Sequence, residues 1–118
     1  MILVGTRPEI IKMAPVVRAF TRRGMPFTLV HSGQHYDYEM SEKFFEDLEL
    51  PSPDINLKIR ASAPAAQTAE VMAGVEGIIG EKRPRLLLVQ GDTNTTLGGG
   101  IAAVKSGVSV AHVEAGLR

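Results

Sequence analysis

Two carboxylates in this sequence follow apolar runs that are typical of buried β-strands. Asp92 comes after "RLLLVQG" and Glu114 comes after "VSVAHV". Carboxylates at neighbouring strand ends can transfer protons, because burial and mutual repulsion raise one pKa into a useful range. Taken alone, Asp92 is better explained as the N-cap of a helix that starts near Thr93. Taken with Glu114, it predicts an acid–base pair.

Basic and polar residues follow two other apolar runs. "GTRPE" places Arg7 beside the N–H groups of a predicted helix start, and Lys12 lies one turn further along. A helix N-terminus with a guanidinium is a good anion site. For Lys12, a solvent-exposed helix face is an equally good explanation. Gln34 and His35 follow the second apolar run. These residues are therefore candidates for binding an anionic ligand.

Two further histidines, His31 and His112, lie inside the ends of apolar runs. Histidine at such a position is often buried and hydrogen-bonded in the core. We therefore keep a structural role open for both.

The elements that position these residues form an α/β pattern. Continuous apolar runs predict strands near residues 1–4, 27–31, 86–90 and 109–113. Unbroken apolar runs are typical of parallel strands that are covered on both faces. Helical segments alternate with them, which predicts an open, Rossmann-like, doubly wound parallel sheet with the strand order 2-1-3-4. Ligands bind such sheets at the carboxyl ends of the strands, where all the candidate residues are expected.

The first predicted helix starts with Thr6 as a cap and with Glu9, an acid that the helix dipole favours. Pro15 is expected to kink or split this helix, because it lacks an N–H and clashes with the preceding turn. Residues 51–64 are rich in proline and are expected to form a loop. The run "LGGGIAA" lies inside the last helix, where each glycine costs about 1 kcal/mol relative to alanine. The sequence gives no firm reason for these glycines.

Composition excludes several functions. The 118 residues suit one domain, and 13 basic and 13 acidic residues give a formal net charge of +0. We therefore expect neither a nucleic-acid partner nor an anionic membrane. The absence of cysteine excludes disulfides and thiolate metal sites and fits a cytoplasmic location. "MILV" is too short for a signal peptide or a membrane span. No nicotinamide, P-loop or metal-binding motif occurs, so we expect no cofactor and no metal.

Four separated blocks carry a resemblance to a known family. The chain resembles the non-hydrolysing UDP-N-acetylglucosamine 2-epimerases through "VGTRPEIIKMAPV", "SGQHYDYEM", "VQGDTNTT" and "AHVEAGLR". Those enzymes have a glycosyltransferase-B-type fold of two Rossmann-like halves with the active site between them. The resemblance implies that residues 1–118 form most of the N-terminal domain and that a second, nucleotide-binding domain is absent. Such a fragment is expected to be inactive alone. Apolar surface left uncovered would favour self-association, so a homodimer is a further expectation.

The resemblance also implies a reaction. The family interconverts UDP-N-acetylglucosamine and UDP-N-acetylmannosamine by eliminating UDP with loss of the C2 proton. UDP then adds back to the resulting 2-acetamidoglycal. By resemblance, Asp92 and Glu114 are the acid–base residues, and which of them takes which proton stays open. The substrate-binding positions implied are Arg7, Lys12, Gln34, His35, Thr93 and Arg118.

One position departs from part of the family. Regulated bacterial members bind a second UDP-N-acetylglucosamine through a stretch with two glutamines, and Asp37 stands where the second glutamine would be. An acid would face a diphosphate poorly, so we expect an unregulated member. Two alternatives stay open. The chain could belong to an epimerase of diacetamido uronic acid nucleotides, or it could be a non-catalytic fragment that binds sugar nucleotides.

Overall fold

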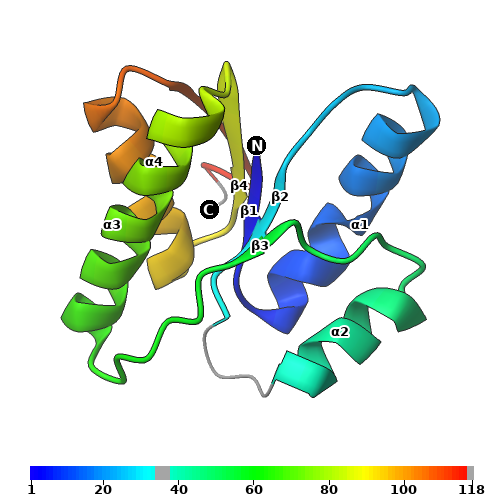
Figure 1. Cartoon of the computed structure of the whole chain (residues 1–118), viewed down its shortest axis with the longest axis horizontal. Coiled ribbons are helices and arrows are strands. Elements are labelled where there is room, and N and C mark those ends of the chain that lie inside the picture. The colour runs from blue at the N-terminus through cyan, green and yellow to red at the C-terminus, as the bar shows by residue number, and fades with distance from the viewer. Residues whose placement is uncertain (34–37, 117–118) are drawn as a thin grey trace.

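Strands and helices alternate along the whole chain (Figure 1). The computed structural model describes residues 1–33 and 38–116. The elements are, in order, β1 (Ile2–Val4), α1 (Arg7–Arg22), β2 (Leu29–His31), α2 (Tyr38–Asp47), β3 (Ile55–Asn56), α3 (Pro64–Lys82), β4 (Leu86–Gln90), α4 (Asn94–Lys105) and β5 (Ser109–Val113). Each helix therefore begins after a strand has ended, at the carboxyl edge of the sheet. Within the described ranges, no helix has the length and apolar composition needed to cross a bilayer.

The sheet has five parallel strands in the order β3-β2-β1-β4-β5. The four predicted strands and their spatial order are confirmed. β4 and β5 pair along their full length, and this register places Gln90 beside Val113. The residues that follow these two, including Asp92 and Glu114, therefore leave the sheet at the same edge.

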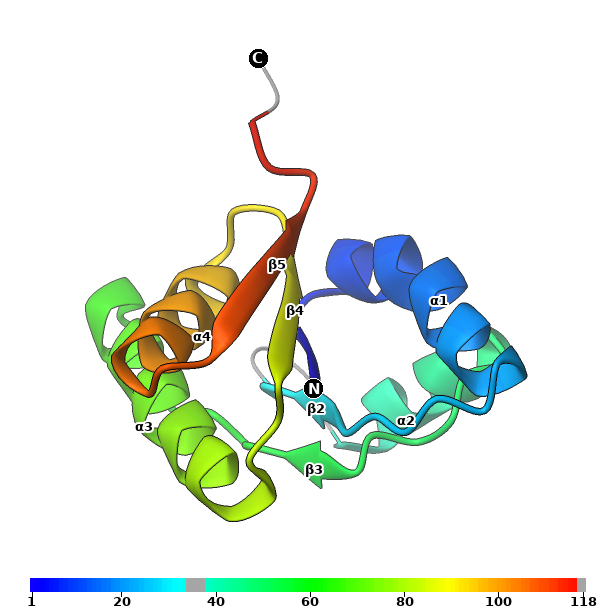
Figure 2. The ribbon, with the colours of Figure 1, turned by 90° about the horizontal axis from the view of Figure 1, so that it is seen from above.

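Helices cover both faces of this sheet. α1 and α2 lie on one face, and α3 and α4 lie on the other (Figure 2). Side chains of β1 alternate between the two resulting cores. Ile2 and Val4 pack under α1, while Leu3 packs with residues of α3 and α4. All three are buried. Burial on both faces explains why the strands read as continuous apolar runs.

The expected loop at residues 51–64 was wrong in part, and the split of α1 that was one of two expected effects of Pro15 does not occur. Residues 51–64 contain β3, whose Ile55 pairs with Val30 of β2, so this segment is not only a loop. Pro15 does not split α1, which runs unbroken on both sides of it. Pro15 and Ile11, whose carbonyl loses its usual N–H partner, are both exposed, so water can satisfy that oxygen. Buried residues before and after Pro15 keep both halves of the helix on the sheet.

Two of the three glycines in α4 allow close helix packing. A Cβ on Gly98 would lie 2.9 Å from the backbone oxygen of Thr68 in α3. A Cβ on Gly99 would overlap the side chain of Leu3 in β1. A Cβ on Gly100 would meet nothing within 4 Å. Gly98 and Gly99 therefore let α4 approach α3 and the sheet, whereas packing does not require Gly100.

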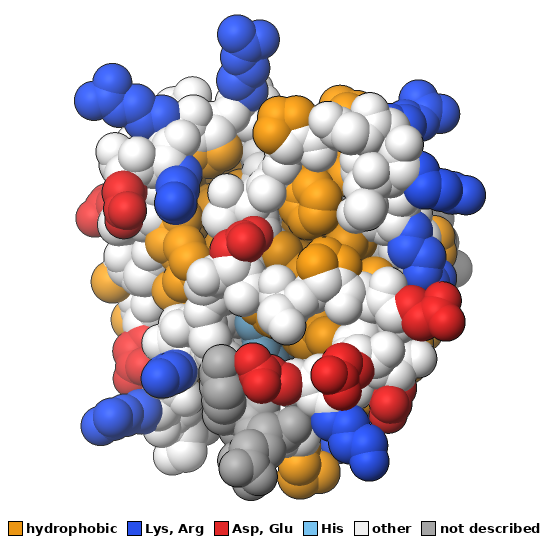
Figure 3. All heavy atoms as spheres, turned by 45° about the vertical axis from the view of Figure 1, so that its right-hand side comes forward, with side chains coloured by type: hydrophobic (Ala, Val, Ile, Leu, Met, Phe, Trp, Pro, Cys, Tyr) orange, Lys and Arg blue, Asp and Glu red, His pale blue; other side chains and the backbone are white. Residues whose placement is uncertain are grey.

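The surface carries both signs of charge. The face shown in Figure 3 has Lys and Arg side chains around its margin and Asp and Glu side chains among them. This mixture matches the formal net charge of +0.

Candidate active site at the carboxyl edge of the sheet

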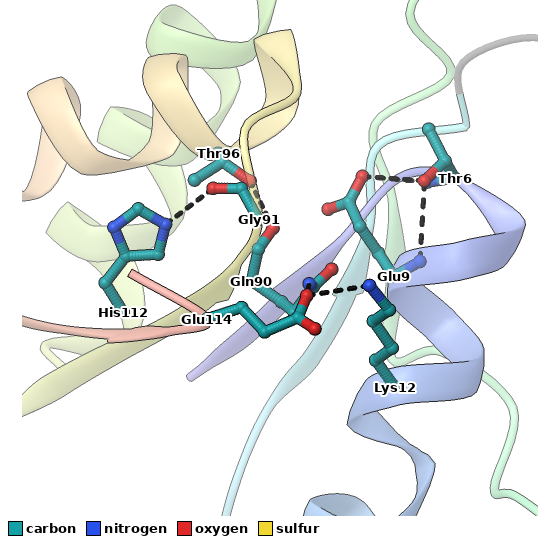
Figure 4. Close-up of polar contacts among 8 residues, drawn as sticks. All are labelled: Thr6, Glu9, Lys12, Gln90, Gly91, Thr96, His112 and Glu114. Carbon is teal, nitrogen blue, oxygen red and sulfur yellow. Dashed lines mark hydrogen bonds and ion pairs between the residues drawn. The ribbon is translucent and has the colours of Figure 1, made fainter. Parts of the chain in front are cut away.

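Glu114 is held by two donors from other elements (Figure 4). Lys12 of α1 places its Nζ 2.8 Å from Glu114 Oε2, and the amide of Gln90 donates to the same oxygen. Gln90 is buried at the end of β4 with 3% of its surface exposed. The Lys12 and Glu114 side chains are 49% and 34% exposed, so their ion pair contributes at most about 1 kcal/mol to folding. The contacts therefore orient Glu114 more than they stabilise the fold.

The backbone of Glu114 is also unusual. Its φ is +60°, in the left-handed region, which costs a non-glycine residue about 1–3 kcal/mol. The bonds from Lys12 and Gln90 help to hold this conformation. Strained residues of this kind occur preferentially at functional sites. Glu49, Lys58 and Arg83 also have a positive φ, so the two side-chain bonds to Glu114, more than its φ, support it as a functional carboxylate.

Asp92 follows β4 and is not the cap of α4. Thr93 is the N-cap, since its Oγ1 accepts from the backbone N–H of Thr96 at 3.3 Å. The capping explanation of Asp92 was therefore wrong. Asp92 is exposed, and it lies with Thr93 and His112 at one end of an open groove of about 650 Å³, whose lining is otherwise mostly apolar side chains of α4 and β5. Asp92 lies at the predicted edge of the sheet. The strand that it follows, β4, is the neighbour of β5, which Glu114 follows.

The two histidines have different environments. His31 is fully buried, and its Nε2 donates to the carbonyl oxygen of Gly5 at 3.2 Å. Burial lowers the pKa of His31, and the bond to Gly5 opposes that effect. His112 is exposed and donates to the carbonyl oxygen of Gly91 (Figure 4). The prediction of a buried, hydrogen-bonded histidine is thus confirmed for His31 and wrong for His112.

The start of α1 is closed by a capping box. Thr6 N and Thr6 Oγ1 both donate to Glu9 Oε1, at 3.1 and 3.0 Å, and Glu9 N donates back to Thr6 Oγ1 at 3.5 Å. The prediction that Thr6 caps the helix is confirmed. These bonds occupy N–H groups that we had expected to face an anion. Cationic side chains must therefore carry more of any anion binding at this helix.

Arg7 is one such cation. It is exposed at the first position of α1, and its guanidinium carbon lies 5.4 Å from the ring centre of Phe44 in α2. A cation over an aromatic ring at this distance gains a favourable electrostatic contact. Phe44 therefore helps to orient Arg7 at the edge of the sheet.

Two strand ends and the first turn of α4 meet at Gly5. Thr95 Oγ1 of α4 donates to Ser32 Oγ, which follows β2, at 3.0 Å, and both residues are buried. A Cβ on Gly5 would overlap Thr95 Oγ1 and lie 2.7 Å from Ser32 Oγ. Only glycine leaves room for these two hydroxyls to meet across the end of β1. This buried hydrogen bond ties the end of β2 to the first turn of α4 beneath the edge of the sheet.

Sequence reasoning missed the importance of Glu9. Only 2% of its surface is exposed, and burial raises its pKa, against the opposing effect of hydrogen bonds from Thr93 and Thr6. Thr93 Oγ1 donates to Glu9 Oε1 at 2.9 Å. The Thr-x-x-Glu spacing of residues 6–9 was the available signal, but it explains only the local cap.

The remaining candidates are placed as follows. Gln34, His35, Asp37 and Arg118 lie outside the described residues. Arg7, Lys12, Thr93, Asp92 and Glu114 all lie at the carboxyl edge, and Lys12 contacts Glu114 directly. In the described part of the chain, no three His, Asp or Glu side chains gather in a group that could hold a metal ion.

A family model described as UDP-N-acetylglucosamine 2-epimerase matches residues 18–118. The chain belongs to this family. A UDP-N-acetylglucosamine 2-epimerase of Methanococcus maripaludis is 47% identical over 117 residues. That match covers 99% of this chain and 31% of the relative. A UDP-2,3-diacetamido-2,3-dideoxy-D-glucuronate 2-epimerase of Pseudomonas aeruginosa is 42% identical over 117 residues, covering 98% and 33%.

Solved structures of the epimerase family share the fold. The crystal structure of Methanocaldococcus jannaschii UDP-GlcNAc 2-epimerase in complex with UDP-GlcNAc and UDP matches with a TM-score of 0.92 and 44% identity. The match covers 99% of this chain and 32% of that chain. The Rossmann-like α/β fold of glycosyltransferase-B type is thereby confirmed. This epimerase-family chain spans about a third of the length of the relatives that it matches.

Proposed function

We propose that this chain forms one wall of the active site of a UDP-N-acetylglucosamine 2-epimerase. The observation that carries the proposal is the orientation of Glu114 by Lys12 and Gln90, beside the strand end that presents Asp92. The crystallised Methanocaldococcus jannaschii relative supports the ligand class, since it was solved with UDP-GlcNAc and UDP. A UDP-sugar is therefore the proposed substrate.

Epimerisation at C2 requires proton transfer on both faces of the sugar. One group removes the C2 proton as UDP leaves, and the proton returns to the opposite face when UDP adds back. Two carboxylates follow adjacent parallel strands at the same edge of the sheet, which supports assigning both to this reaction. We assign this work to Asp92 and Glu114 as a pair, without dividing the two protons between them.

The departing UDP carries a diphosphate whose negative charge increases during elimination. Arg7, oriented over Phe44, and Lys12 are the cations that we assign to this group. Lys12 already pairs with Glu114, so a bound diphosphate would compete for the same ammonium. Electrostatic stabilisation of this kind is usually a large part of enzymatic rate enhancement. Thr93, Gln34, His35 and Arg118 complete the proposed substrate-binding set.

A diacetamido uronic acid nucleotide is the second candidate substrate, and one comparison supports it. The diacetamido-glucuronate epimerase of Pseudomonas aeruginosa is 42% identical to this chain, close to the 47% of the Methanococcus maripaludis relative. The proposal also includes a cytoplasmic location, a homodimer and, because of Asp37, no allosteric activation. The inert sugar-nucleotide-binding fragment is the alternative for the chain in isolation.

The test uses two proteins. One is this chain, and the other, which we call the joined protein, is this chain fused to the part of the Methanocaldococcus jannaschii relative that it does not cover. Each is incubated with UDP-N-acetylglucosamine in heavy water and followed by NMR for UDP-N-acetylmannosamine and for deuterium at C2. We expect epimerisation by the joined protein and little by the chain alone, because one wall supplies only part of the positioning and electrostatics.

Two variants of the joined protein decide the roles. Asp92→Asn and Glu114→Gln should each lower kcat by about 100-fold or more, as expected for loss of an acid–base group. Glu70→Gln is the matched control, because Glu70 binds the backbone of residues 60–61 and contacts neither carboxylate. Full activity of both site variants would overturn the acid–base assignment. A parallel incubation of the joined protein with the diacetamido uronic acid nucleotide tests the second substrate, and conversion of that nucleotide alone would support it.

A further inference from the structure

Glu9 is the buried carboxylate that joins the two faces of the domain at the carboxyl edge. It belongs to α1, which covers one face of the sheet, and its Oε1 accepts from Thr93 Oγ1 at 2.9 Å. Thr93 is the N-cap of α4, which covers the other face. The two residues are 84 positions apart in sequence. A single carboxylate oxygen therefore serves the caps of two helices on opposite sides of the sheet.

The position of this bond matters for ligand binding. β1 and β4 are neighbours in the sheet, and the helices that follow them pass to opposite faces. In doubly wound sheets, ligands bind where the chain directions diverge in this way. Arg7 follows Thr6 directly, and Asp92 precedes Thr93 directly. Glu9 thus bonds to Thr6, which precedes the cation proposed to bind the diphosphate, and to Thr93, which follows a proposed acid–base residue.

The carboxylate is held through one oxygen only. Thr6 N, Thr6 Oγ1 and Thr93 Oγ1 all donate to Oε1, at 3.1, 3.0 and 2.9 Å. Oε2 is buried and has no hydrogen-bond partner among the described residues. An oxygen that accepts three bonds from two helices fixes the separation of those helices. Loss of this oxygen would remove a hydrogen-bond acceptor from the N-terminus of α1 and from the N-terminus of α4 at the same time.

We propose that Glu9 is a positioning residue that keeps the start of α1, with Arg7, and the start of α4, with Asp92, in fixed register for the reaction. This inference rests on the proposed function. Glu9 does not touch the reacting atoms in this role. It acts through Thr6 and Thr93, so that the cation and the carboxylate meet the two ends of one substrate.

The first part of the test needs no activity and uses this chain. Glu9→Ala should shift the backbone amide resonances of Asp92, Thr93 and Thr96, although these lie at the start of a helix on the other face of the sheet. Glu9→Ala and Thr93→Val should also be non-additive in urea unfolding, so that the double variant loses less stability than the sum of the two single losses, because both single variants lose the same Glu9–Thr93 bond. Glu70→Ala is the control, since it removes a carboxylate that accepts from the backbone N–H groups of Arg60 and Ala61 but should leave these amides unmoved. Unmoved α4 amides or additive midpoints would overturn the proposed link.

The second part measures epimerisation by the joined protein. Glu9→Ala should lower kcat by up to about 100-fold with a smaller change in KM, as expected when reacting groups are displaced by about 1 Å. Glu9→Gln keeps an acceptor oxygen and should recover most of that loss. Equal kcat for wild type and Glu9→Ala would overturn the positioning role. If the unmutated joined protein were inactive, the proposed function and this role would both fail, while the amide shifts would still decide whether Glu9 links the helices.

Discussion

Replacing Gly98 and Gly100 of α4 separately by alanine isolates the contribution of close helix packing to stability. Both positions lie inside the helix, so each substitution gains about 1 kcal/mol of helix propensity. The variants differ in what the new methyl group meets. At position 98 it would lie 2.9 Å from the backbone oxygen of Thr68 and 3.0 Å from Val71 Cβ. At position 100 it would meet nothing within 4 Å.

The magnitude follows from these distances. A backbone oxygen cannot rotate away, so α3 and α4 must separate to admit the methyl group at position 98. Overpacking of this kind costs about 1–3 kcal/mol. Because the propensity gain of about 1 kcal/mol is common to both variants, the packing cost alone sets their difference. We therefore expect Gly100→Ala to be more stable than wild type and Gly98→Ala to be less stable than Gly100→Ala by about 1–3 kcal/mol.

Urea unfolding of this chain, followed by circular dichroism at 222 nm, measures both variants. The slopes of the transitions should agree, so that the midpoints report stability. Equal midpoints for Gly98→Ala and Gly100→Ala would refute the claim that Gly98 is required by helix packing.

Three further substitutions test the edge of the sheet. Gly5→Ala should lower the free energy of unfolding by about 1–3 kcal/mol, because its Cβ overlaps buried hydroxyl groups. Gly77→Ala, with nothing within 4 Å, is its control in the same urea assay. Burial lowers the pKa of His31, so the folded state resists protonation and stability should fall as the pH drops below the ordinary value of 6.5. His31→Asn should flatten that decline in thermal melts across this range. Burial raises the pKa of Glu9, so stability should fall as the pH rises above the ordinary value of 4.5, and unfolding curves of Glu9→Gln should lack this trend.

The sequence was sufficient for most of the fold. Strands such as β1 are buried on both faces, and this produces the unbroken apolar runs from which they were predicted. β3 was missed because its two half-buried residues, Ile55 and Asn56, show no such run. The absence of a split at Pro15 was not predictable, because solvent exposure, which lets water satisfy the freed carbonyl, is a property of the folded surface. Local sequence patterns therefore predicted most helices and strands, but they did not predict features such as β3 and the unbroken α1, which depend on the folded structure.

The candidate site was predictable as a set of residues but not as a set of contacts. Strand ends identified Asp92 and Glu114, because parallel strands end at one edge. The pairing of Lys12 with Glu114 joins residues 102 positions apart and depends on how α1 lies on the sheet. Glu9 was overlooked although its sequence pattern predicted a local role. Its role at the start of α1 already explained it, and its contact with Thr93 appears only after folding.

The arrangement of the helices has a consequence for how a charged ligand approaches. The four helices of the described residues begin at the carboxyl edge, where a helix N-terminus carries about half a positive charge, which the Glu9 carboxylate offsets at α1. The chain as a whole has a formal net charge of +0, so a distant anion experiences no net attraction. The attraction of helix ends and basic side chains is confined to roughly one Debye length, about 10 Å at 0.1 M salt. If the proposed UDP-sugar binds here, this chain should attract it at short range only, and the chain's contribution to the association rate should depend only weakly on ionic strength.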